Sequence, residues 1–234
     1  MGQLKKIIYD IGSNNGDDIP YYLMKADLVI AVEANPDLCN QIKTQFSKEI
    51  TDGRLIVENV VIDINESRDT VAFYIHNNNH VLSQFTVPDN INSFRQVLLP
   101  SKNIISLIKE HGDPYYIKID VEHFDQYILQ AIFLEGIFPL YISAESHSID
   151  VFSSFVNTKK YYKFKLVDGP TVFQKYDNAS ILTQAGEVTY SFPYHSAGPF
   201  GNDIDGPWLT EHELYSALMT NGLGWKDIHA SLID

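Results

Sequence analysis

Short apolar runs alternate with amphipathic segments along most of this chain, and no other feature limits its fold as strongly. The apolar run at 5–11 is followed by an amphipathic segment at 17–26, and the run at 28–34 by a segment that Pro36 opens at its first turn. The runs are rich in Ile, Val and Tyr, which favour strands. This alternation predicts an α/β fold, in which helices cover both faces of a mostly parallel sheet.

The same rhythm predicts the remaining elements. Further strands are expected at 54–62, 70–77, 114–122, 140–146 and 162–169, with 187–192 completing the sheet. Further helices are expected at 103–112, 124–136, 148–157 and 210–221, the last capped by Thr210 with Glu213 as the third helical residue. The length of 234 residues suits one such unit, so 1–234 are predicted to form a single domain.

Two segments interrupt the rhythm. Residues 77–103 combine three consecutive Asn with two Pro, which indicates an irregular excursion that we interpret as a substrate loop. Residues 193–209 are dense in Gly and Pro and contain Trp208, a combination that we interpret as a lid with an aromatic wall. A surface loop ahead of the last helix is the alternative for this second segment.

Composition excludes several classes of protein. Asp and Glu total 30 against 17 Lys and Arg, so the net charge of −13 repels a phosphate backbone and predicts no nucleic-acid binding. Cys39 is the only cysteine, which rules out an internal disulfide and fits a reducing compartment. No signal-peptide pattern begins the sequence, and no apolar run approaches the roughly 20 residues that cross a bilayer. We therefore expect a cytoplasmic protein without membrane contact.

The loop after the first strand, "IGSNNG", indicates what the sheet binds. Ligands of open parallel sheets lie beyond the carboxyl ends of the strands, and dinucleotides require G-x-G-x-x-G there. Gly12 and Gly16 enclose Ser13, Asn14 and Asn15, so the second glycine of that fingerprint is absent, which argues against an NAD-dependent oxidoreductase. Backbone N–H groups could instead hold an amino-acid carboxylate, while Asp10 accepts from its ammonium group. S-adenosylmethionine carries both groups.

Acidic residues follow the second and third predicted strands at positions that suit an adenosine. Glu33 lies 21 positions after Gly12, close to the spacing at which an acidic residue binds ribose hydroxyls. Asp63 is expected to accept from the adenine amino group, with Ile62 or Ile64 packed on the ring. A carboxylate just past a strand is also a common turn cap, which stays the alternative for Asp63.

Four motifs make the chain similar to a known family. They are "YDIGSNNGD" at 9–17, "VEANP" at 32–36, "YIKIDVEHFDQYIL" at 116–129 and "SAGPFGNDIDGPWL" at 196–209. In this order they resemble the FkbM family of S-adenosylmethionine-dependent methyltransferases. Family members read K-I-D-V-E-G-x-E in the third motif, whereas this chain has His123 in place of the glycine and Asp125 in place of the second acid.

The resemblance implies a fold, an activity and a set of residues. The fold would be the Rossmann-like class I methyltransferase fold, with a seven-stranded sheet. The activity would be methyl transfer to a hydroxyl of a sugar-like or glycan-precursor acceptor. The cofactor pocket would comprise Asp10, Gly12, Asn14, Gly16, Glu33, Ala34, Asp63 and Asp120. Asp120 and Glu122 would also face the reaction centre.

Methyl transfer to a hydroxyl needs alignment of three atoms and a base that removes or shares the proton. Candidates should follow the fourth and fifth parallel strands, which selects Asp120, Glu122, His123, Glu145 and His147. Because histidine titrates near neutrality, His147 or His123 is the favoured base.

A metal ion is the alternative way to acidify the acceptor. Asp120, Glu122, Glu145 and His147 could together bind Mg²⁺. Helix caps and pairing with Lys118 account for the same carboxylates, so a divalent metal is possible on this pattern but not favoured.

The sequence thus predicts an O-methyltransferase that uses S-adenosyl-L-methionine and a small sugar-like acceptor. A noncatalytic ligand-sensing or assembly module that keeps the cofactor fold is the alternative, favoured by the departures at His123 and Asp125. Self-association as a homo-oligomer is left open.

Overall fold

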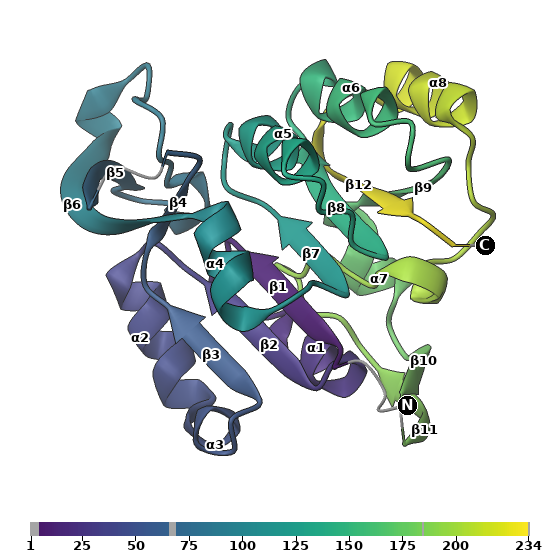
Figure 1. The fold of residues 1–234 in the computed structure, drawn as a ribbon, viewed down its shortest axis with the longest axis horizontal. Helices are drawn as coiled ribbons and strands as arrows, with labels where there is room; N and C mark the ends of the chain where they lie inside the picture. Colours follow the sequence, from purple (N-terminus) through teal and green to yellow (C-terminus); the bar gives the residue numbers. More distant parts are fainter. Residues whose placement is uncertain (1–4, 66–68, 184, 234) are drawn as a thin grey trace.

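A seven-stranded sheet forms the centre of the computed structural model, which describes residues 5–65, 69–183 and 185–233 (Figure 1). Its strands are, in spatial order, β3 (Leu55–Glu58), β2 (Leu28–Val32), β1 (Ile7–Ile11), β7 (Tyr116–Ile119), β8 (Tyr141–Ser146), β12 (Gly224–Ser231) and β9 (Lys163–Asp168). Only β12 runs antiparallel to its neighbours. The predicted mostly parallel sheet is confirmed.

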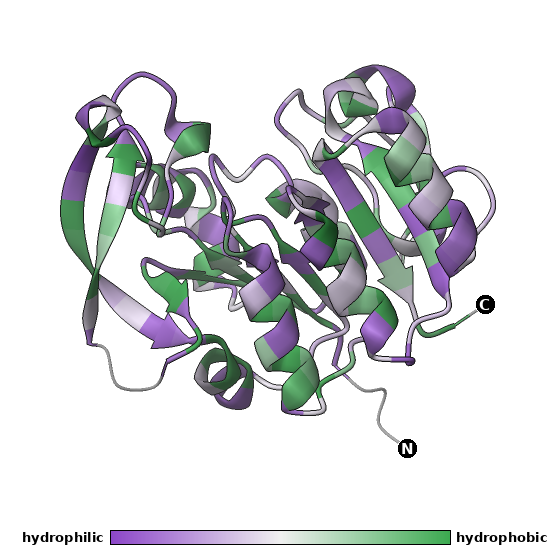
Figure 2. Cartoon of the chain, turned by 90° about the horizontal axis from the view of Figure 1, so that it is seen from above, coloured by the Kyte–Doolittle hydropathy of each residue, from purple (hydrophilic) through white to green (hydrophobic). Residues whose placement is uncertain are grey.

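Helices cover both faces of this sheet because its central strands are apolar on both sides. All five residues of β1 are buried, with Ile7, Tyr9 and Ile11 in one core and Ile8 in the other. The first core includes side chains of α4 (Ile104–His111), α5 (Asp125–Leu134), α6 (Ile149–Asn157) and α8 (Glu211–Asn221). The second includes side chains of α1 (Ile19–Lys25), α2 (Pro36–Gln45), α3 (Ser47–Thr51) and α7 (Val172–Lys175). In Figure 2 the covering helices mix hydrophobic and hydrophilic residues.

Polar side chains cap the N-termini of α2, α4 and α8. Asn35 accepts a hydrogen bond from the backbone of Asp37 ahead of α2, and Asn103 caps α4 in the same way. Thr210 and Glu213 form the predicted capping box of α8.

The chain changes direction across the sheet between β1 and β7. From β1 it continues outward through β2 to β3, then returns to the other side of β1 with β7 and β8. Helices leave from the carboxyl ends of β1 and β7 towards opposite faces, and ligands bind at such a switch point.

The predicted strand at 54–62 is wrong in its continuity, because two strands occupy it. Asn59 separates β3 from β4 (Val61–Asp63), and its side chain donates to the carbonyls of Glu33 and Ala34 at 2.8 and 3.0 Å. β4 joins a small sheet with β6 (Phe94–Asn103) and β5 (Thr70–His76). This small sheet stands to one side of the central one (Figures 1 and 2).

The small sheet also corrects the predicted excursion at 77–103. Its last ten residues, from Phe94 onward, form the regular strand β6, paired antiparallel with β5. The part before Phe94 is mainly a loop with two short 3-10 turns, η1 (His80–Leu82) and η2 (Ile91–Ser93).

The predicted strand at 187–192 does not complete the sheet. It forms β11 (Gly186–Tyr190), which pairs with β10 (Ala179–Thr183) as a separate hairpin. The missing strand is β12, whose Asp227, His229 and Ser231 are buried polar residues that disguise it in the sequence.

The predicted lid at 193–209 is buried in its middle, at 196–201, while most of the residues on either side of this stretch are exposed or half-buried. The segment contains the 3-10 turn η4 (Gly201–Asp203), and another 3-10 turn, η3 (Gly169–Thr171), comes earlier in the chain, before α7. Asp18 accepts hydrogen bonds from the Ser196 hydroxyl and, at 3.1 Å, from the Ala197 N–H. Phe200 stacks on Tyr116 with 4.1 Å between ring centroids.

Among the described residues, no helix is both long and apolar enough to span a membrane.

Candidate active site

A cavity of about 610 Å³ opens beyond the carboxyl ends of β1, β2, β7 and β8, at the switch point. The small sheet and its loop contribute one wall, including Phe73, His80 and Phe85, and the start of β12 contributes Trp225. The volume lies in the range of small-molecule sites.

Gly12 is required where the first loop meets β7. Its φ is +86°, and a Cβ on it would lie 1.8 Å from the Asp120 carbonyl oxygen. The N–H groups of Gly12 and Ser13 donate to the Val32 carbonyl at 3.0 and 2.9 Å, and that of Gly16 to the Ser13 carbonyl at 2.8 Å. These three N–H groups are therefore used within the protein.

Glu33 fixes the middle of the same loop. Its two carboxylate oxygens accept from the N–H groups of Asn14 and Asn35, each at 2.7 Å. Burial raises the pKa of Glu33 to about 7, against the lowering effect of these two hydrogen bonds. With the Asn14 N–H also occupied, the expectation that this loop's N–H groups bind a carboxylate is wrong for these four groups. The Asn14 Oδ1 is buried beside the cavity and has no hydrogen-bond partner in the described structure.

Lys118 stands between two aspartates at the ends of β1 and β7. Its Nζ lies 3.5 Å from an Asp10 oxygen and 3.2 Å from an Asp120 oxygen, and donates to the Gly12 carbonyl at 2.9 Å. Burial raises the pKa of Asp10 and Lys118 lowers it, with a net rise. For Asp120 burial also raises the pKa, but Lys118, a side-chain hydrogen bond with Glu145 and the nearby His147 together lower it by more, so the net shift is downward. Asp120 is therefore the anionic partner that faces the cavity.

Two carboxylates and two imidazoles gather where β7 and β8 end. The His147 Nε2 lies 3.0 Å from a Glu145 oxygen and 3.5 Å from a Glu122 oxygen. The rings of His123 and His147 are 5.0 Å apart between centroids. Glu122 and His123 have φ of +37° and +65°, so the turn adopts a left-handed conformation without a glycine.

Burial shifts the pKa values of the side chains gathered at the ends of β7 and β8. It raises the pKa of Glu122 to about 7, and with Asp120 and Glu122 it raises that of Glu145 to about 10. Burial and the neighbouring His147 lower the pKa of His123. Groups perturbed in this way within a cavity are typical of functional sites.

The cavity brings together most of the predicted residues. All five catalytic candidates line it: Asp120, Glu122, His123, Glu145 and His147. Of the predicted cofactor residues, Gly12, Asn14, Glu33, Ala34 and Asp120 also line it, as does Ile62.

Three predicted cofactor residues are not part of its lining. Asp10 lies behind the cavity beside Lys118, and a Cβ on Gly16 would meet Ile19, Ile42 and Phe46 at 3.1 to 3.2 Å. Asp63 accepts from the N–H groups of Ile64 and Asn65 at 2.7 and 3.2 Å, which is the capping alternative.

Several lining residues were not predicted individually. Tyr194 and His195 come from the segment interpreted as a lid, and His80 comes from the segment interpreted as a substrate loop. The His80 and His195 rings lie 6.4 Å apart. Trp225, which packs over Gly169 and lies 6.1 Å from the Tyr194 ring, carries no signal in the sequence.

No family model matches the chain, and no curated protein does. Among solved structures it is similar to the methyltransferase FkbM of Methylobacillus flagellatus, with 16% identity, a TM-score of 0.46 and coverage of 69% of this chain and 39% of that one. It is also similar to the precorrin-6y C5,15-methyltransferase of Geobacter metallireducens, with 12% identity, a TM-score of 0.40 and coverage of 71% of this chain and 68% of that one. A SAM-dependent O-methyltransferase of Thermotoga maritima shares 9% identity, with a TM-score of 0.41 and coverage of 98% of this chain and 60% of that one. Similarities this distant assign neither a family nor an activity. The strand order itself is that of the predicted Rossmann-like class I methyltransferase fold.

Proposed function

We propose that the chain binds S-adenosylmethionine in this cavity and transfers its methyl group to a hydroxyl of a small, sugar-like acceptor. The observation that carries the proposal is the gathering of Glu33, Asp120 and the Glu145–His147 pair around one cavity at the switch point. These groups supply a ribose acceptor, an anion and proton-transfer groups, in that order along the sheet edge.

The adenosine half fits the side of the cavity formed by β2 and β4. Glu33 is fixed by two backbone donors and retains lone pairs for the two ribose hydroxyls. The adenine would lie among the apolar side chains of Leu38, Ile62 and Phe73, which line the same side.

The methionine half fits the centre of the cavity. Its ammonium and sulfonium groups are cations, and the Asp120 carboxylate faces them, held by Lys118 at 3.2 Å. The buried Asn14 Oδ1 offers the ammonium a hydrogen-bond acceptor. In this proposal the methionyl carboxylate does not rely on the N–H groups of Gly12, Ser13, Asn14 or Gly16.

The acceptor would approach from the side of Tyr194, His195 and Trp225. Aromatic faces pack against the C–H faces of sugars, and histidines supply hydrogen bonds to hydroxyl groups. In the reaction the hydroxyl oxygen attacks the methyl carbon, the carbon–sulfur bond breaks with its electron pair going to sulfur, and the hydroxyl proton passes to a base.

We assign the base to His123. Its side chain lines the cavity, and its lowered pKa keeps the imidazole neutral and able to accept a proton near pH 7. The His147 Nε2, by contrast, lies within 3.5 Å of two carboxylates.

Calorimetric titration with S-adenosylmethionine tests the binding. Replacing Glu33 with Ala should weaken binding by about 10- to 100-fold, because hydrogen bonds to a charged group contribute about 1.5–3 kcal/mol. Glu110→Ala is the matched control, since Glu110 is an exposed carboxylate outside the cavity lining. Unchanged binding by Glu33→Ala would refute the pocket assignment.

Formation of S-adenosylhomocysteine with a panel of sugar acceptors tests the reaction. Product should form with at least one acceptor that bears a free hydroxyl. Tight cofactor binding without product for any acceptor would favour the noncatalytic module instead.

A further inference from the structure

We propose that Glu122, Glu145 and His147 bind a divalent transition-metal ion inside the cavity. One ligand atom from each residue lies within 4.8 Å of the others. Ligands bound at about 2.1 Å are spaced roughly 3.0 to 3.5 Å apart in octahedral or tetrahedral geometry. The Nε2 of His147 lies 3.0 and 3.5 Å from the two carboxylate oxygens, which matches that spacing.

The orientation of His147 is an independent observation that points to a ligand. Its Nε2 is buried and has no hydrogen-bond partner among the described residues, although a Glu145 oxygen is only 3.0 Å away. The nitrogen and the carboxylate therefore approach each other without the alignment of a hydrogen bond. A cation between them would be the common partner of both.

These two carboxyl groups are largely buried without a lysine or arginine partner among the described residues, and Glu145 shares a side-chain hydrogen bond with Asp120 instead. The side chains of Glu122 and Glu145 are 18% and 7% exposed, and neither forms an ion pair with a Lys or Arg in the described parts of the chain. Helix caps and pairing with Lys118 were the reasons to discount a metal from the sequence. In the structure Lys118 pairs with Asp120, one of the four candidate ligands. It otherwise contacts Asp10 and the Gly12 carbonyl rather than Glu122 or Glu145.

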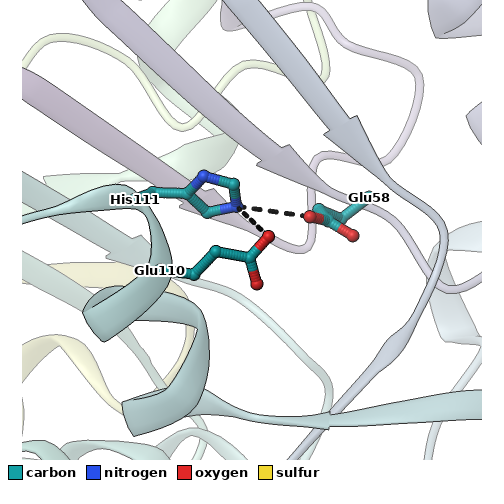
Figure 3. Close-up of side chains that lie close together, drawn as sticks. All are labelled: Glu58, Glu110 and His111. Atoms are coloured by element: carbon teal, nitrogen blue, oxygen red, sulfur yellow. Dashed lines mark hydrogen bonds and ion pairs between the residues drawn. The ribbon is translucent and has the colours of Figure 1, made fainter.

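A second cluster of the same composition shows what a neutralised arrangement looks like. Glu58, Glu110 and His111 also bring three possible ligand atoms together (Figure 3). Here the Lys102 ammonium lies 3.1 Å from Glu58 and 2.8 Å from Glu110. Because this outer cluster already contains a cation, we assign the metal to the cavity cluster alone.

Two oxygens and one imidazole favour Mn²⁺, Fe²⁺ or Zn²⁺ over Ca²⁺ or Mg²⁺, which prefer oxygen ligands only. The cavity side of the cluster would leave coordination positions for water or for the acceptor hydroxyl. A bound metal would lower the pKa of that hydroxyl, and His123 would receive its proton. This catalytic role rests on the proposed function, whereas metal binding does not.

Titration of the chelator-treated chain with Mn²⁺, followed by electron paramagnetic resonance of the free ion, tests the site. One Mn²⁺ should bind per chain, and Glu145→Gln and His147→Ala should each weaken binding at least 10-fold. Glu110→Gln, in the outer cluster, should leave binding unchanged. Absence of binding, or weakening by Glu110→Gln without weakening by Glu145→Gln, would overturn the proposal.

A spectroscopic measurement on the unsubstituted chain guards against variants that fail to fold. Pulsed resonance of bound Mn²⁺ should show coupling to an imidazole nitrogen, and its absence would overturn the assignment of His147. Calorimetry with S-adenosylmethionine in excess chelator separates the two proposals. Cofactor binding without any Mn²⁺ site refutes the metal alone, and Mn²⁺ binding without cofactor binding refutes the methyltransferase alone.

Discussion

Two clusters in this molecule contain the same three residue types and differ in how their charge is balanced. The outer cluster, Glu58, Glu110 and His111, joins β3 to α4, and Lys102 from β6 lies within 3.1 Å of both carboxylates. In the cavity cluster, Glu122, Glu145 and His147, the described residues supply no Lys or Arg partner. A His–carboxylate cluster with its own cation is a structural link, whereas one without it is prepared for a charged ligand.

The largest expected difference is in activity. His147→Ala should reduce S-adenosylhomocysteine formation by about 10²- to 10⁴-fold, the range for losing a group that activates the acceptor. His111→Ala removes the equivalent imidazole from the outer cluster and should leave the rate unchanged while lowering the unfolding midpoint. Equal rate losses in the two variants would show that the clusters do not differ in function.

A second prediction concerns pH and the buried carboxyl group of Asp18. Asp18 accepts from Ser196 and Ala197, and burial raises its pKa to about 7, with Asp10 raising and Lys118 lowering it. Between about pH 4 and pH 7 the folded state therefore keeps a proton on Asp18 that the unfolded chain has released. The contribution of Asp18 to the unfolding free energy is fully present below about pH 4 and is lost as the pH rises to about 7.

The loss should reach a few kcal/mol, since each unit of pKa shift corresponds to about 1.4 kcal/mol. Urea denaturation at pH 4.5, 6 and 7.5 measures it in the absence of cofactor. Asp18→Asn keeps a side chain of the same shape and should flatten the dependence. An equally steep decline in that variant would assign it to other acids.

The sequence predicts the sheet well where strands are apolar and poorly where they are not. The central strands follow from runs of Ile, Val and Tyr, because both faces of a parallel sheet are buried. β12 escapes prediction because Asp227, His229 and Ser231 give it the composition of a surface segment. In the small sheet β5 matches the predicted strand at 70–77, whereas β4 escapes because Asn59 interrupts what reads as one continuous strand, and β6 lies in the segment interpreted as irregular.

The site follows the same division. Glu33, Asp120 and Glu145 are predictable because a residue at the carboxyl end of a central strand must lie at the switch point. Asp10 is not in the cavity lining although it lies on β1, where it shares the face of Ile8 and pairs with Lys118. Trp225 and His80 reach the cavity only through the tertiary packing of distant segments, which no local pattern records.

His123 offers a third prediction, in which stability and activity change in opposite directions. Its φ of +65° is one that glycine adopts freely and other residues adopt at a cost of about 1 kcal/mol or more. His123→Gly should therefore raise the unfolding free energy by about 1 kcal/mol and still slow methyl transfer, because it removes the proposed base. Chemical denaturation and the product assay measure the two effects. A variant that is stabilised and fully active would refute the assignment of the base to His123.

Lys102 gives the smallest effect and the complementary result. Lys102→Met removes the cation of the outer cluster, leaving Glu58 and Glu110 without their shared ammonium. Because the Glu110 side chain is 54% exposed, solvent screens its pair with Lys102, and the unfolding free energy should fall by only about 0.5–1 kcal/mol. The fall should shrink in high salt, and Mn²⁺ affinity and methyl transfer should not change. If Lys102→Met also created a second Mn²⁺ site in the outer cluster, the presence of a protein cation would be the one property that separates the two clusters. A lysine placed beside the cavity cluster should then abolish Mn²⁺ binding in the cavity.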